Sequence, residues 1–289
     1  GNLANLHHDQ GRIAEALEHY HQAIAIHRRV GERRFEGITV GDLAILHREA
    51  GRFGDALAHF RQALDIARGF NNQRQEGIIH GHLALLYQQQ GDFSEALSRY
   101  QRALGINRKI GDRRSEGHTL GNLAGLHQHL GRLGKAEDNY RAALAIHRAV
   151  GERGFEGMTL GNLGDLQYSR GDYETAEANL HEAILICDEL WPVAAGAFRA
   201  SLALIRGHQG DFESARKLLA VGEPQLRDVY ALELGKLLCK KALLEHMAGD
   251  AETAQIAIEE ARLVATEISA GPDSELGNAI SEARSAMGL

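Results

Sequence analysis

The sequence predicts an all-α protein, a solenoid of about seven antiparallel helical hairpins with a capping helix over 273–287 at its C-terminal end. Three observations support this fold class. Helix-forming residues dominate the 289-residue chain, and no run of alternating β-branched residues occurs. Only three prolines are present, so long helices can continue without interruption. Finally, the sequence repeats itself with a period of about 40 residues.

A glycine between two helical patterns marks each repeat. It stands at the end of one predicted helix, where glycine is favoured because it readily adopts the left-handed conformation of a helix C-cap. The spacing is 40 residues between the first five of these glycines and 39 between the last three. They are Gly11, Gly51, Gly91, Gly131, Gly171, Gly210 and Gly249.

The second helix of each repeat follows that glycine. An alanine, an aromatic residue, a second alanine and an isoleucine recur at spacings of four, three and three, which places them on one helix face. In the third repeat they are Ala96, Tyr100, Ala103 and Ile106. One hairpin cannot bury both of its apolar faces. We therefore expect stacked hairpins with a continuous core, the first helices lining a concave side.

The order of residues across one hairpin resembles the tetratricopeptide repeat (TPR). The residues that carry this match in the third repeat are Leu83, Ala84, Tyr87, Gly91, Ala96, Tyr100 and Ala103. The usual repeat has about 34 residues. This longer form is similar to the repeats of the Pins and LGN cell-polarity scaffolds and, less closely, of kinesin light chains. The resemblance covers essentially the whole chain and implies a right-handed superhelix that binds proteins.

The repeats predict a single TPR solenoid over 1–289. Five regular repeats occupy 1–190, the first of them truncated at its start, and two divergent repeats with the capping helix occupy 191–289. Pro192 and Pro224 interrupt the pattern in the divergent part, and we expect both to favour helix starts. The chain begins inside a repeat and without Met, so we expect it to be a piece of a longer protein.

Four of the first helices begin with a Glu–Gly pair, at 36–37, 76–77, 116–117 and 156–157, and each has a second glycine four residues later, such as Gly41. A glycine costs a helix about 1 kcal/mol relative to alanine, and we expect close packing of the neighbouring helix to offset that cost. Arginines such as Arg28 and Arg33 cluster just before the glutamate. We expect them to pair with it; an acidic partner along this edge is the alternative.

A polar stripe on the first helices is the candidate binding site. An Asn in this stripe offers a donor and an acceptor to an extended ligand backbone, and the resemblance implies an Asn ladder that holds target peptides extended. Asp42 and His82 depart from that ladder, and a solvated stripe that favours solubility is the alternative. The predicted groove residues are Asn2, Asn5, Asp42, Glu49, His82, Gln89, His118, Asn122, His129, Met158, Asn162 and Asp165.

Other classes of site find little support. Histidines recur at His7, His47 and His127, but Tyr87 stands at the equivalent place, so we expect rings packed between helices and no metal site. No phosphate-binding loop and no HExxH, CxxC or GxSxG motif occurs, which predicts a protein that is not an enzyme and needs no cofactor. The two cysteines, Cys187 and Cys239, are expected to be buried free thiols.

We therefore expect a cytoplasmic scaffold that binds an extended or helical segment of a protein or peptide partner in its concave groove. Nucleic acid and membrane partners are not expected, because the chain has neither a dense basic stripe nor a long apolar segment. One alternative is a regulatory or sensor arm of a larger signalling protein with a kinase or nucleotide-switch ATPase domain. Another is a structural repeat that self-associates weakly through its open N-terminal repeat.

Overall fold

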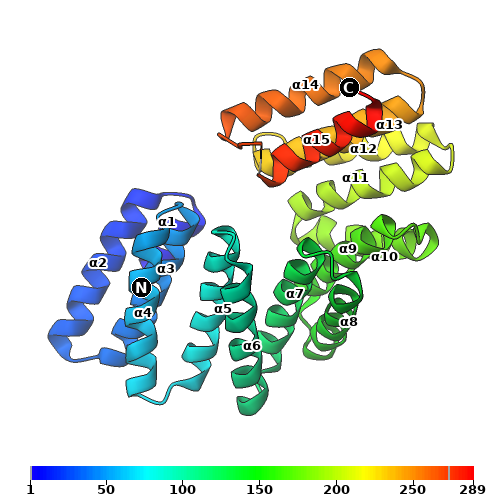
Figure 1. Cartoon of the computed structure of the whole chain (residues 1–289). Helices are drawn as coiled ribbons and strands as arrows, with labels where there is room; N and C mark the ends of the chain where they lie inside the picture. Colours follow the sequence, from blue (N-terminus) through cyan, green and yellow to red (C-terminus); the bar gives the residue numbers. More distant parts are fainter. Residues whose placement is uncertain (1, 273) are drawn as a thin grey trace. The chain divides into compact units, whose positions relative to one another are not determined.

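The structure is a computed structural model that describes residues 2–272 and 274–289 (Figure 1). These residues form fifteen helices and no strand, which confirms the predicted fold class. In chain order the helices are α1 (Asn2–Asp9), α2 (Ile13–Val30), α3 (Arg33–Glu49), α4 (Phe53–Gly69), α5 (Gln73–Gln89), α6 (Phe93–Ile110), α7 (Arg113–His129), α8 (Leu133–Val150), α9 (Arg153–Ser169), α10 (Tyr173–Leu190), α11 (Pro192–His208), α12 (Phe212–Leu226), α13 (Ala231–Met247), α14 (Ala251–Glu267) and α15 (Glu275–Met287).

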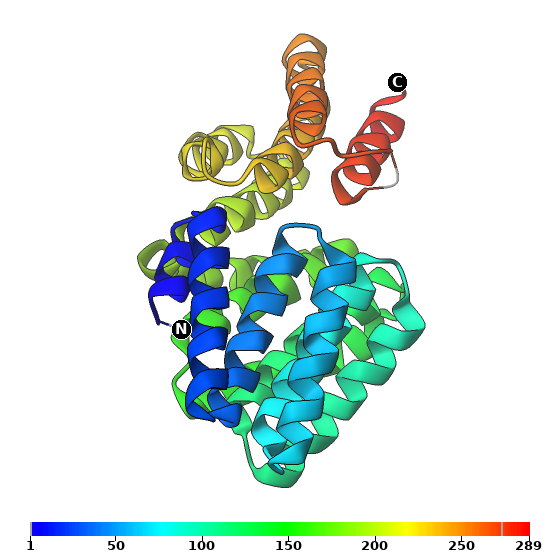
Figure 2. The ribbon, with the colours of Figure 1, turned by 90° about the vertical axis from the view of Figure 1, so that its left-hand side faces the viewer.

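The chain divides into two compact units, residues 1–146 (unit 1) and 147–289 (unit 2). Consecutive helices pack as hairpins: α1 with α2, α3 with α4 and α5 with α6 in unit 1, then α9 with α10, α11 with α12 and α13 with α14 in unit 2. Figures 1 and 2 show the hairpins of unit 1 standing side by side. In unit 2, α15 packs on α13 and α14 as the expected capping helix. Residue 273, its predicted first residue, lies outside the described residues, and the single solenoid over 1–289 stays a prediction.

The repeated apolar stripe forms the core. Ala56 and Phe60 of α4 and Ala96 and Tyr100 of α6 are all completely buried. The turn glycines have the predicted left-handed backbone, for example Gly51 with φ 70° after α3 and Gly91 with φ 78° after α5. Polar N-caps begin several second helices; Asp92 accepts a hydrogen bond from the Glu95 backbone N–H at the start of α6.

The two prolines differ in position. Pro192 is the first residue of α11, as predicted. Pro224 lies inside α12, near its end at Leu226, so the expectation of a helix start there is wrong. A proline in the last turn removes only one backbone hydrogen bond, and its fixed φ is already helical. The chain then turns at Asp228, which has φ 63°.

The second glycine of a first helix is closely packed in α9, where a Cβ added at Gly161 would overlap the Phe198 ring of α11, but not in α5 or α7. A Cβ added at Gly37 would lie 2.6 Å from Cγ2 of Ile66 on α4, and one at Gly157 would lie 2.9 Å from Sγ of Cys187 on α10. These contacts confirm close helix packing at the glycine after the glutamate. At Gly81 and Gly121 an added Cβ would meet nothing within 4 Å, so the packing role predicted for the second glycine is wrong there.

This difference predicts opposite effects of two alanine substitutions within unit 1. Gly37→Ala should destabilise the protein by about 1–3 kcal/mol, because the Ile66 side chain must move. Gly81→Ala should stabilise it by about 0.5–1 kcal/mol, because alanine favours the helix and its methyl group has room. Thermal unfolding of both variants measures the pair, and changes of the same sign would contradict this account of the packing.

Each buried glutamate after an inter-hairpin turn is held by arginines from both sides of that turn, an arrangement called here the arginine clamp. Arg28 Nε at the end of α2 donates to Glu36 Oε1 at 2.7 Å, and Arg33 Nη1 donates to Glu36 Oε2 at 2.8 Å. The Glu36 side chain is 0% exposed. The same clamp joins Arg108 and Arg113 to Glu116 in unit 1 and Arg148 and Arg153 to Glu156 in unit 2.

The clamp also controls the charge of its carboxylate. Burial raises the pKa of the Glu156 carboxyl group, but the hydrogen bonds from Arg148 and Arg153 outweigh this effect and hold the pKa below its usual value. Glu156 therefore stays ionised although it is buried. The ion pairs at Glu36, Glu116 and Glu156 confirm the predicted pairing of arginines with the recurrent glutamates.

Removing one clamp carboxylate should cost stability. We expect Glu36→Ala to lower the free energy of unfolding by about 1–3 kcal/mol, because it removes the charge-assisted hydrogen bond from Arg28 of the preceding hairpin and a second one from Arg33 within α3. Glu15→Ala on the exposed surface of α2 is the matched control and should change little. Chemical denaturation measures both; equal stability of the two variants would show that the clamp does not hold the hairpins together.

Candidate functional site

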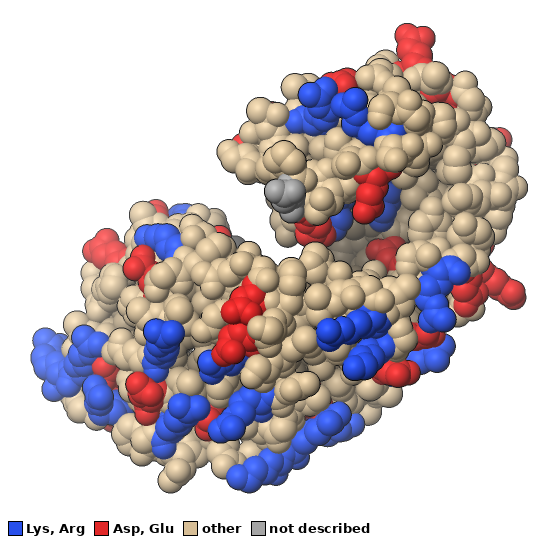
Figure 3. All heavy atoms as spheres, viewed as in Figure 1, with Lys and Arg blue, Asp and Glu red and all other residues tan. Residues whose placement is uncertain are grey.

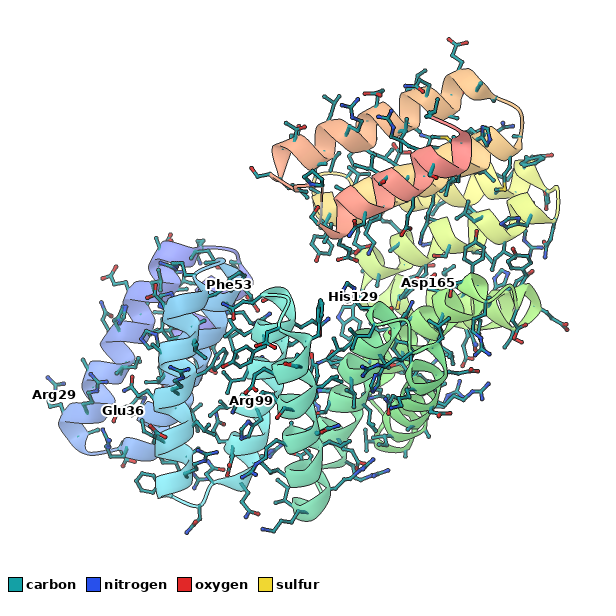
Figure 4. The ribbon with its side chains drawn as sticks, in the orientation of Figure 1. Arg29, Glu36, Phe53, Arg99, His129 and Asp165 are labelled. Carbon is teal, nitrogen blue, oxygen red and sulfur yellow. The ribbon has the colours of Figure 1, made fainter. Side chains whose placement is uncertain are left out.

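The predicted polar stripe lies on the first helices of the hairpins and stays outside the apolar core. On α3 and α5, Asp42 and His82 are half-buried, whereas Asn122 at the equivalent place on α7 is exposed. In Figure 4, His129 lies at the opposite end of unit 1 from Arg29 and Glu36. The other exposed members in unit 1 are Asn2, Asn5, Glu49, Gln89 and His129.

Three polar groups on α3 and α5 have unmet hydrogen-bonding capacity, and we call them the 42–48–82 cluster. The Arg48 cation acts on the nearby His82 ring, and Asp42 stands one repeat before His82 in the polar stripe. No hydrogen bond or ion pair to the Asp42 carboxylate is present within the described residues, and burial raises the pKa of that carboxyl group, opposed in part by His8. Arg48 has an 11% exposed side chain and a buried Nε without a described partner. His82 has a buried Nδ1 that likewise lacks a partner in the described part of the chain.

The ring of His82 is held in place by Phe60 on α4. The two rings stack with centroids 6.0 Å apart and an interplanar angle of 5°. Burial and, to a lesser extent, the Arg48 cation lower the pKa of His82 to about 4. The imidazole is therefore neutral near pH 7, with one nitrogen as a donor and the other as an acceptor.

Two other predicted residues are already engaged inside unit 1. Glu49 Oε2 lies 2.6 Å from Nε2 of His8 on α1, and Glu49 Oε1 accepts from Arg48 Nη2 at 3.0 Å. The Asn5 amide oxygen accepts a hydrogen bond from the Tyr20 hydroxyl at 2.8 Å. A ligand would have to compete with these contacts.

The remaining predicted residues are less closely grouped. On α7, His118 is half-buried and the His129 ring lies 4.8 Å from the ring of Phe93. In unit 2, α9 carries three half-buried members, Met158, Asn162 and Asp165. The Asn ladder that would include both Asn122 and Asn162 stays a prediction.

Histidines and cysteines have the packing roles that the sequence predicts. His47 and His127 are buried, and the His47 ring stacks on His59 with centroids 5.1 Å apart. Cys187 and Cys239 are buried free thiols, and burial raises the pKa of Cys187 to about 11. Among residues 2–272 and 274–289 no cluster of three or more His, Cys, Asp or Glu could hold a metal ion. None of the described helices is long and apolar enough to span a membrane.

Sequence reasoning missed two residues. Arg48 belongs to the 42–48–82 cluster, although Gln88 and Gln128 stand at the equivalent places. His80 occupies a core position where the other repeats have apolar residues: Val40, Leu120 and Leu160. This mismatch between repeats was the available signal.

The comparisons with known proteins agree with this architecture. Residues 1–69 match the family model described as tetratricopeptide repeat, and residues 76–267 match the model of the MalT-like TPR region. The chain belongs to the MalT-like TPR family. No curated protein sequence matches it.

Several solved structures share this TPR fold. A Rap protein complexed with Competence and Sporulation Factor has a TM-score of 0.73 and 17% identity, over 92% of this chain and 74% of that one. A signal transduction ATPase with numerous domains and a TPR sensor, from Pyrococcus horikoshii, has a TM-score of 0.73 and 18% identity. It matches over 99% of this chain, which spans only 43% of that ATPase. A kinesin light chain-like repeat protein from Podosopora anserina has a TM-score of 0.52 and 18% identity, over 66% and 95% of the two chains. These identities show the fold alone.

The buried His80 side chain is expected to lower the stability of the protein. Its side chain is 2% exposed, and both ring nitrogens are buried without hydrogen-bond partners in the described residues. We expect His80→Leu, the residue of the equivalent positions 120 and 160, to raise the free energy of unfolding by about 1–3 kcal/mol at pH 7. A lower melting temperature would contradict this and would indicate that the imidazole has a bound partner.

His80 and His82 together predict that the stability of the protein depends on pH. Burial, with the cation of Arg99 next in importance, lowers the pKa of His80 to about 4, as burial does for His82. The unfolded chain therefore binds more protons than the folded one below pH 6.5, and stability should decrease as the pH falls from 6.5 towards 4. Melting temperatures measured across that range check this, and His80→Leu should make the decrease shallower. An identical slope in both proteins would contradict the assignment.

Proposed function

We propose that the chain is a non-enzymatic TPR scaffold that holds a peptide segment against the first helices of unit 1. The 42–48–82 cluster is the observation that carries this proposal. A buried polar group without a partner costs about 1–3 kcal/mol, and native proteins leave few such groups unexplained. A ligand that supplies partners to Arg48 Nε and His82 Nδ1 removes that cost, and the half-buried Asp42 carboxylate offers it an acceptor.

The chemistry of the cluster favours an extended segment. Arg48 Nε can only donate, the Asp42 carboxylate can only accept, and the neutral His82 ring can do either. An extended backbone presents N–H and C=O groups in alternation, so it meets both requirements along one line. A helical segment has its backbone groups paired internally and would have to use polar side chains instead.

A second candidate function is a sensor arm of a larger signalling protein. The match to the MalT-like TPR region and the likeness to the TPR sensor of an archaeal ATPase favour it. It is compatible with peptide binding, since a sensor arm also needs a ligand site. The domain composition of the full-length parent protein tests this role, and a parent with no kinase or nucleotide-switch domain would contradict it.

Two finer proposals concern location and self-association. We place the protein in the cytoplasm because both cysteines are free and buried, as is usual in a reducing compartment. Exposed Leu3 and Leu6 on α1 give the N-terminal repeat an apolar surface that could join two copies weakly. Light scattering over a range of concentrations tests the second proposal.

The binding proposal is tested by titration. A partner peptide recovered with the chain by affinity capture and mass spectrometry is titrated against the unmodified chain, Asp42→Ala and Arg48→Gln. Each substitution should weaken binding about tenfold or more, whereas Asp42→Ala should not lower the melting temperature, because it removes a partly buried carboxylate without a partner. Glu15→Ala on α2 is the matched control. Unchanged affinity in both variants would place the peptide elsewhere on the protein.

A further inference from the structure

A second surface of unit 1 lies at the turn between α4 and α5, separate from the first-helix face. A shallow hollow is bounded there by α3, the end of α4 and the start of α5. Most of its lining is apolar, and its polar residues are one arginine, Arg34, and the two amides Asn72 and Gln75. The residues that matter here are Gly37, Ala63, Ile66, Ala67, Phe70 and Arg34.

The positive charge of Arg34 at this hollow has no acidic partner, and the next inter-hairpin turn of unit 1, between α6 and α7, shows the difference. There, Arg74 Nε lies 3.0 Å from Oδ2 of Asp112. Forty residues earlier, Arg34 occupies the place of Arg74 and Asn72 that of Asp112. Asn72 keeps the capping role, because its side-chain oxygen accepts from the Gln75 N–H at 3.2 Å, but a neutral amide cannot neutralise an arginine.

Arg34 therefore lacks the carboxylate that its counterpart has. Within the described residues neither Arg34 nor Arg29, in the last turn of α2, forms an ion pair or a hydrogen bond, and both are exposed. Figure 4 shows Arg29 at this end of unit 1, and Figure 3 shows basic side chains gathered along this edge. This concentration of positive charge attracts an acidic ligand.

The apolar part of the hollow limits the size of the ligand. Phe70 is 54% exposed at the end of α4, and Ile66 beneath it is nearly buried. The hollow itself has a volume of only about 10 Å³, about the space of one water molecule, so it can take no more than the tip of a side chain that lies against Phe70. The geometry points to a peptide segment in which an acidic residue stands next to an aliphatic one. Its carboxylate pairs with Arg34, as Asp112 pairs with Arg74, and its aliphatic side chain packs on Phe70 and Ile66.

The test uses fluorescein-labelled octapeptide pools with a central Glu-Leu pair, or with Gln-Leu or Glu-Ser in its place, and measures fluorescence anisotropy. The unmodified chain should bind the Glu-Leu pool saturably. Arg34→Gln and Asn72→Asp should each weaken that binding roughly tenfold or more. Asn72→Asp is the sharper variant, because Asp caps a helix as well as Asn does and supplies Arg34 with an internal carboxylate. Arg61→Gln on the exposed side of α4 is the matched control and should change nothing.

Further measurements separate this site from the one proposed on the first helices. Arg48→Gln should leave binding of the Glu-Leu pool unchanged; if it weakens binding while Asn72→Asp does not, the pool binds the first-helix face and this inference is wrong. It is equally overturned if the unmodified chain fails to bind the Glu-Leu pool saturably or binds all three pools equally. Displacement of the pool by butyrate at a similar concentration would show a site for a small carboxylate instead of a peptide.

Discussion

Every repeat of this chain depends on its neighbours, because a two-helix hairpin has more apolar surface than it can bury alone. The stripe that contains Phe60 and Tyr100 is completely buried only because further helices pack on each hairpin. Gly37 allows α4 to approach α3 closely within one hairpin, and the arginine clamp ties the end of α2, in the preceding hairpin, to Glu36 at the start of α3. Packing within a hairpin and electrostatics between hairpins therefore act on the same turn of α3.

Helix positions could be predicted well from the sequence, because a 40-residue period repeats the same turn and core positions many times. The finer packing could not. Gly37 and Gly41 lie four residues apart and on nearly the same helix face, so the period cannot tell which of them meets the neighbouring helix. Pro224 was misplaced for a related reason: a proline signals that a helix begins or ends nearby, and only the packed structure shows that α12 continues for two more residues.

The sequence predicted which residues lie on the candidate binding face, but it did not predict which of their hydrogen bonds are already made. The half-buried state of Asp42 and His82 follows from their place in the helical stripe. The unmet bonding capacity of Arg48 does not, because a long side chain can take many directions and only tertiary contacts select one. The engagement of Asn5 by Tyr20 likewise depends on contacts across the hairpin. By contrast, the change from Asp112 to Asn72 could be seen by aligning the repeats, although its effect on Arg34 required the structure.

The arginine clamp also affects where the chain can gain or lose whole repeats. A regular hairpin ends with an arginine and the next begins by presenting a glutamate, so each regular junction uses the same pair of groups. A duplicated or deleted 40-residue block would leave these junctions chemically intact. At the junction after α10 the two charges are exchanged. Asp188 stands at the place of the arginine and accepts a hydrogen bond from Arg199 on α11, and Gly196 stands at the place of the glutamate. A regular hairpin inserted at that point would bring its buried glutamate towards Asp188, and the resulting repulsion fixes where the regular series must end.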